Sequence, residues 1–216
     1  MNENRDALIN RLAAESGTGQ SRLHVPRLAG TWLLLGTLMA ATFSAVVEPY
    51  RPGFLEQLLT VPRFTLEMAL GAGAIAALVM AVLRLAVPGV ARPVHFISAA
   101  ALTLLWVGMI VLSLFSPALD LGTLGARTLC WVETFLYGLP VMALGFVVAG
   151  RGYVLHWVPA GLLIGLVSGF FPGLIMQLAC MYQAKHDLIA HIGPALPLAV
   201  IGGVIGLILA GRRASR

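Results

Sequence analysis

Two cysteines are the groups in this sequence best suited to chemistry, and its 216 residues contain no others. Cys130 begins one long apolar segment, and Cys180 ends the next apolar segment along the chain. If both segments cross a membrane, they run in opposite directions, so the two thiols lie level near the same face. Level thiols can form a disulfide when their Cα atoms approach within about 7 Å, or bind a soft metal ion as thiolates. A third interpretation is two small buried side chains without chemistry.

Glu133 is the acidic residue nearest to the first thiol, three residues after Cys130 and on the same helix face. Its carboxylate could tune the thiol or bind a metal; alternatively, it is hydrated near the interface and orients its helix. A carboxylate inside a span usually faces the bundle interior beside a partner. The candidate partners in the neighbouring outer loops are His186, His191, Arg127 and Lys185.

The composition indicates which elements position these residues. Hydrophobic residues make up 59% of the chain and charged residues only 11%, whereas a soluble domain is about 25% charged. A membrane-spanning helix needs roughly 20 mostly apolar residues. Six segments qualify, over residues 28–47, 65–87, 94–115, 128–149, 154–180 and 192–211. We therefore predict an all-α fold, a polytopic transmembrane bundle of six helices.

The basic residues predict how this bundle is oriented. Cytoplasmic loops of membrane proteins carry an excess of lysine and arginine. If the N-terminus is cytoplasmic, ten of the fourteen basic residues lie inside and four outside. The outer four are Arg51, Arg63, Arg127 and Lys185. We therefore expect both termini in the cytoplasm and both thiols at the outer face, which in a Gram-negative inner membrane is the periplasm, where disulfides persist.

A polar N-terminal segment is the part of the sequence able to bind a soluble partner. We divide the chain into a cytoplasmic segment, a six-helix transmembrane domain and a short cytoplasmic tail, over residues 1–27, 28–211 and 212–216. Within the first part, residues 3–15 predict a short helix on which Leu8, Ile9 and Leu12 share one face.

The sequence disfavours three other classes of protein. The net charge of +5 comes from arginines scattered between apolar segments, which is not the basic patch of a nucleic-acid-binding protein. A membrane thiol–disulfide oxidoreductase would need a second cysteine pair or a Cys-x-x-Cys motif, and the sequence has neither. A small transporter would normally carry more buried charge.

Four glycines spaced by four residues form a smooth ridge on the fifth predicted helix, at Gly161, Gly165, Gly169 and Gly173. Such a ridge lets two helix backbones approach closely. The ridge can serve packing within one chain or between chains, so the oligomeric state stays open.

Several stretches resemble one family of membrane proteins. The opening Asp6–Ala14, the Cys130-Trp131-Val132-Glu133 motif with Leu139-Pro140 after it, and Ala179–Tyr182 around the second cysteine carry the resemblance. Together with six spans they are similar to the negative-regulator-of-sigma-F family of membrane-bound anti-sigma factors, the NrsF-like proteins.

The resemblance implies a regulator and not an enzyme. Such a protein lies among the lipids of the bacterial inner membrane and holds an extracytoplasmic-function sigma factor there through its cytoplasmic N-terminus. The resemblance makes Cys130 and Cys180 the sensor pair for an outside metal or oxidative stress, with a soft metal ion as one possible ligand. Glu133, His186 and His191 are then candidate modifiers of the sensor. The apolar face of Leu8, Ile9 and Leu12 is the candidate contact for the sigma factor.

Overall fold

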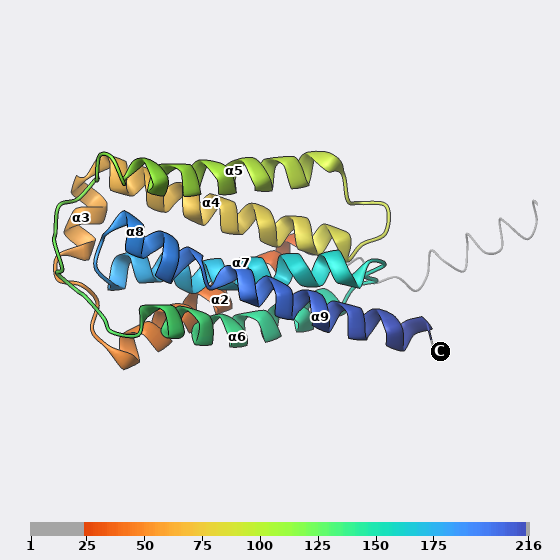
Figure 1. Ribbon diagram of the computed structural model, residues 1–216. Helices are drawn as coiled ribbons and strands as arrows, with labels where there is room; N and C mark the ends of the chain where they lie inside the picture. The colour runs from red at the N-terminus through yellow and green to blue at the C-terminus, as the bar shows by residue number, and fades with distance from the viewer. Residues whose placement is uncertain (1–23, 215–216) are drawn as a thin grey trace, which may run out of the picture.

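The computed structural model describes residues 24–214, and within that range its regular structure is entirely helical (Figure 1). The elements are α2 (Val25–Val47), α3 (Phe54–Thr60), α4 (Pro62–Leu85), α5 (Pro93–Leu112), α6 (Cys130–Gly150), α7 (Trp157–Ala179), α8 (Ala184–His186), the π-helical segment η1 (Asp187–Ile192) and α9 (Ala195–Ala214). The predicted helix over residues 3–15, with Leu8, Ile9 and Leu12, lies outside the described residues.

Within the described residues, six helical segments are long and apolar enough to cross a membrane, which confirms the predicted all-α fold with six apolar spans. The first five fall where the hydropathy placed them, with ends shifted by a few residues. The sixth begins at Ala184 instead of residue 192. His186 and His191 were predicted in a loop, and the structure instead places both in the helical turns that lead into α9.

α7 lies at the centre of the bundle and packs against α2, α4, α6 and α9 (Figure 1). α5 packs mainly on α4, at the outside of the bundle. In the most apolar window of α7, 61% of residues are buried inside the protein, compared with 17% in α5. The side chains that α5 turns outward are apolar, as at Leu104 and Leu105. An outer surface of this kind is suited to lipid rather than water.

The glycine ridge of α7 packs against α9 of the same chain. A methyl group added at Gly161 would meet the carbonyl oxygen of Gly202, and one added at Gly165 would meet that of Leu198. The backbones of α7 and α9 are therefore in direct contact along the ridge, as the predicted glycine ridge permits. This contact fixes the position of the segment around His191, which immediately precedes α9.

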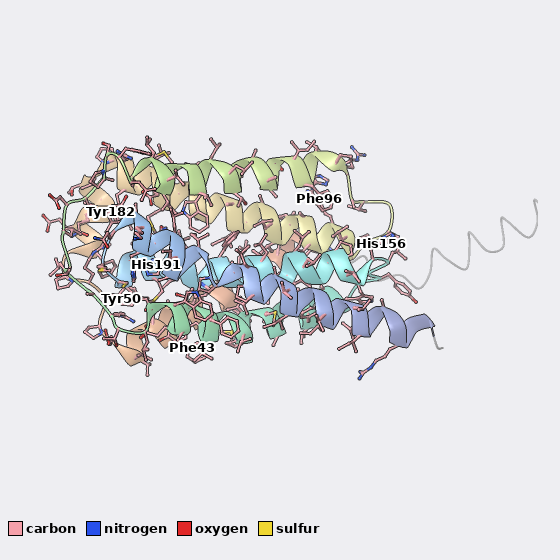
Figure 2. All side chains as sticks on the ribbon, viewed as in Figure 1. Phe43, Tyr50, Phe96, His156, Tyr182 and His191 are labelled. Atoms are coloured by element: carbon pink, nitrogen blue, oxygen red, sulfur yellow. The ribbon has the colours of Figure 1, made fainter. Side chains whose placement is uncertain are left out.

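The two ends of the bundle differ in structure. α3, α8 and the loop between α5 and α6 cover one end, whereas the C-terminal end of α9 lies at the other (Figure 1). His191, Tyr182 and Tyr50 lie at the end covered by α3, and His156 lies at the opposite end (Figure 2). Both cysteines belong to the end covered by α3, because Cys130 starts α6 and Cys180 directly follows α7.

Candidate metal and thiol site

The two thiols meet at the covered end of the bundle. The sulfur atoms of Cys130 and Cys180 lie 2.7 Å apart, although the residues are 50 positions apart in the sequence. Both side chains are buried and neither is in a disulfide. Antiparallel packing of α6 on α7 brings the start of one helix beside the end of the other. The predicted level placement of the thiols is therefore a direct contact.

Two histidines complete a cluster around the thiols. The Nε2 atom of His186 lies 3.4 Å from the sulfur of Cys180. The rings of His186 and His191 are perpendicular, with their centroids 4.9 Å apart. One ligand atom from each of the four residues can be chosen so that all lie within 4.8 Å of one another. Two sulfurs and two imidazole nitrogens at this spacing could hold a metal ion.

A π-helical turn brings the two histidines together. They are five residues apart, and on an α-helix of about 100° per residue they would point roughly 140° apart. The wider turn of η1 is visible in the hydrogen bond from the amide of Gly193 to the carbonyl of Leu188, five residues back. Pro194 follows and has no amide proton to continue the α-helical pattern. The sequence thus interrupts the helix at the point where the two rings must face each other.

Asp187 lies directly beside the second histidine. Its Oδ1 atom is 2.8 Å from Nδ1 of His191, and both side chains are almost completely inaccessible to solvent. A histidine whose Nδ1 faces a carboxylate keeps a proton there and presents the lone pair of Nε2. Asp187 could not be identified as a site residue from the sequence, because it is one polar residue of a short predicted loop and nothing in its spacing distinguishes it.

Arg51 fixes the backbone at the second thiol. From the loop between α2 and α3, its Nη1 atom donates to the carbonyl oxygen of Cys180 at 2.8 Å. Its Nη2 atom donates to Oε1 of Gln57 at 2.9 Å. Burial lowers the pKa of Arg51, and the negative charges of Asp187 and Cys180 oppose that shift. The guanidinium remains charged and places a positive charge beside the thiol site.

The first thiol is flanked by a second buried arginine. Nη1 of Arg127 lies 3.2 Å from Oε2 of Glu133, and both residues are buried. Among the four candidates, Arg127 is therefore the partner that Glu133 contacts. The alternative of a hydrated Glu133 is not what the structure shows, and its carboxylate is not part of the four-residue cluster. Arg127 links Glu133 to the thiol site. Its side chain contacts Glu133, and its carbonyl oxygen lies 3.5 Å from the sulfur of Cys130.

The environment makes the two thiols unequal. The hydrogen bond with Cys130 lowers the pKa of the Cys180 thiol, burial opposes the shift, and the neighbouring His186 and His191 rings lower the pKa further. Cys180 is thus the more acidic thiol of the pair. It more readily forms the thiolate, which is the form that binds metals and reacts with oxidants.

The comparison with known families decides what kind of protein carries this site. Residues 12–210 match the family described as negative regulator of sigma F, over nearly the whole chain. The chain belongs to the NrsF family. The family description denotes an anti-sigma factor, which is a regulator of transcription. No curated protein and no solved structure matches the chain.

Membership of the NrsF family agrees with the architecture. The family match covers residues 12–210, which includes five of the apolar helices, nearly all of the sixth, and the four residues of the thiol and histidine cluster. The cluster therefore lies inside the matched region, and its chemistry rests on the geometry described above. The family and the six apolar helices together support a multi-pass membrane protein that regulates a sigma factor.

Proposed function

We propose that this NrsF-family protein is an inner-membrane anti-sigma factor that sequesters an extracytoplasmic-function sigma factor and releases it under periplasmic metal or oxidative stress. The N-terminal segment, residues 1–27, binds the sigma factor in the cytoplasm. Cys130 and Cys180 receive the signal at the outer face. The observation that carries the proposal is the contact between the only two cysteines of the chain, 2.7 Å apart, in a member of an anti-sigma family.

The orientation within the membrane follows from the charges and the helices together. Six alternating spans put the two ends of the chain on the same side of the membrane, and the excess of arginine supports assigning that side to the cytoplasm. The thiol site is then periplasmic. Of the four basic residues assigned to the outer side, Arg51 and Arg127 are buried in specific contacts with carbonyl and carboxylate oxygens. These two arginines are needed on the outer side for their contacts, so they do not count against the proposed orientation. The bias of the remaining basic residues toward the cytoplasmic side is therefore stronger.

Thiol chemistry gives two ways to receive a signal at this site. A disulfide requires the sulfurs to approach to about 2.05 Å, whereas two thiolates on a tetrahedral zinc-like ion stand roughly 3.8 Å apart, from Zn–S distances of about 2.3 Å. The observed separation of 2.7 Å lies between these values. Either event moves the start of α6 relative to the end of α7, and this is the change that the regulator transmits.

Co-purification tests the anti-sigma role. Tagged full-length protein should recover the sigma factor from membranes, and the triple change Leu8→Ser, Ile9→Ser and Leu12→Ser should abolish recovery and raise transcription from sigma-dependent promoters. The matched control is Asn10→Ser with Ala14→Ser, which alters the opposite face of the predicted helix. Recovery of the sigma factor by the triple variant at the level of this control would refute the proposed binding segment.

A further inference from the structure

We propose that Cys130, Cys180, His186 and His191 bind one zinc-class divalent ion as a four-ligand centre, and that Asp187 positions His191 for that ion. This names the ligand of the proposed sensor and rests on that proposed function. It also makes the histidines ligands instead of modifiers of a cysteine pair. A set of two sulfurs and two imidazole nitrogens is the tetrahedral donor set that zinc prefers.

An unsatisfied nitrogen points to a missing ligand. His191 is fully buried, and neither of its ring nitrogens makes a hydrogen bond within residues 24–214; Nδ1 faces Asp187 as an ion pair, which leaves Nε2 without any partner there. Leaving a buried polar atom unpaired costs free energy, so such atoms are rare in folded proteins. The ligand atom offered by His191 lies within 4.8 Å of those of the two cysteines and His186. A metal ion between these four atoms would satisfy the nitrogen.

The carboxylate of Asp187 has the placement of an outer-shell partner. Its Oδ1 atom lies 2.8 Å from Nδ1 of His191, on the side of the ring away from Nε2. In metal sites this arrangement fixes the tautomer and orientation of the ring and makes the ligand more basic. Asp187 is fully buried and directly follows His186, so adjacent positions at the junction of α8 and η1 supply one ligand and the partner of the other ligand.

The spacing of the ligand atoms suits a single ion. Around a tetrahedral ion with Zn–S of about 2.3 Å and Zn–N of about 2.0 Å, the ligand atoms stand roughly 3.3–3.8 Å from one another. The thiols are closer than this at 2.7 Å, and Cys180 and His186 are 3.4 Å apart. Binding one ion therefore requires the two sulfurs to separate by about 1 Å, and this separation is the movement of α6 relative to α7 that would transmit the signal.

Metal binding by the reduced full-length protein in detergent tests the centre. We expect one Zn²⁺ per chain, X-ray absorption showing two sulfur and two nitrogen neighbours, and a tetrahedral visible spectrum with Co²⁺ that Zn²⁺ abolishes. His186→Ala and His191→Ala should weaken Zn²⁺ binding by at least 100-fold. The control His156→Ala alters a histidine at the opposite end of the bundle and should have no effect (Figure 2).

Asp187→Asn separates positioning from ligation, because all four ligands remain. Loss of an outer-shell carboxylate typically costs 10–100-fold in metal affinity, so we expect Zn²⁺ binding weakened by about that factor with two sulfur and two nitrogen neighbours retained. A purely structural role for Asp187 would leave Zn²⁺ affinity unchanged. Asp187→Glu, which keeps the carboxylate, should recover part of the affinity.

The wild-type measurement keeps the centre falsifiable even if a histidine variant does not fold. A bound ion with two sulfur neighbours and no imidazole, or no bound ion in the reduced protein, would overturn the four-ligand centre. Equal Zn²⁺ affinity of the folded His186→Ala, His191→Ala and His156→Ala proteins would do the same. If the metal centre forms as expected but sigma-factor release does not depend on it, the proposed function is refuted and the metal site is retained.

Discussion

Arg127 and Glu133 form a buried ion pair at the start of α6, with Nη1 and Oε2 separated by 3.2 Å. The same guanidinium donates to backbone carbonyl oxygens at the end of α2, at Ser44, Glu48 and Pro49. Arg127 therefore connects the helix that begins with Cys130 to the first span. α2 is the span that follows the N-terminal segment directly, so this contact offers a route from the thiol site toward the proposed sigma-binding part of the chain.

Arg127→Gln should destabilise the protein and impair signalling. The change leaves the Glu133 carboxylate buried without a partner, and breaking a buried pair in this way costs about 3–5 kcal/mol. We expect a lower thermal unfolding midpoint in detergent and raised sigma-dependent transcription without stress. The additional change Glu133→Gln should restore part of the lost stability, because it removes the unpaired charge.

Arg63→Gln is the matched control for this charge. Arg63 lies at the same end of the bundle, and within residues 24–214 its guanidinium donates to the hydroxyl groups of Ser113 and Ser116. Its replacement should cost less than Arg127→Gln does, because its two bonds lie in exposed or partly buried positions and no buried charge is left unpaired. An unfolding midpoint for Arg127→Gln equal to that of Arg63→Gln would contradict the importance of the buried pair.

Arg51→Met should loosen the backbone around the second thiol. The change removes the hydrogen bond to the carbonyl oxygen of Cys180 and leaves that oxygen without its charged donor. We expect Cys180 to react faster with a small alkylating reagent in the metal-free protein, by roughly tenfold or more, since about 1.4 kcal/mol of lost local stability gives a tenfold change in opening.

Gln57→Ala provides the control for the Arg51 variant, because Gln57 bonds the same guanidinium and makes no hydrogen bond with Cys180 in the described part of the chain. Its alkylation rate should remain close to that of the wild type. The rates are measured by mass spectrometry of the labelled peptide. Equal alkylation of both variants at the wild-type rate would show that Arg51 does not hold the backbone at the site.

The sequence was sufficient to predict the spans and the level thiols, because hydropathy and antiparallel chain direction determine both. It was also sufficient to include Arg127 among the partners of Glu133. The roles of Arg51 and Asp187 could not be predicted. Arg51 was indistinguishable from a residue that orients the protein in the membrane, and Asp187 becomes notable only when the π-helical turn places it beside His191. Such turns have no reliable pattern in a single sequence.

Cys130→Ser and Cys180→Ser should each abolish release of the sigma factor under metal or oxidative stress. Serine has nearly the size of cysteine but forms neither a disulfide nor a thiolate ligand, so the bundle should fold and still bind the sigma factor. The measurement combines co-purification without stress and reporter transcription with stress. The two residues form one contact, so the double variant should behave as either single variant does. An unchanged stress response in both single variants would eliminate the thiol switch and leave the anti-sigma role intact.

Gly165→Ala should separate α7 from α9 and thereby disturb the site from a distance. The new methyl group would meet the carbonyl oxygen of Leu198, which belongs to the backbone and cannot rotate away. Overpacking of this kind costs about 1–3 kcal/mol, and it displaces the helix that continues from η1. Gly108→Ala is the matched control, since Gly108 lies in α5 with no atom within 4 Å of the added methyl group. We expect a reduced unfolding midpoint and weaker Zn²⁺ binding for Gly165→Ala only, because the close backbone contact holds His191 opposite the two cysteines.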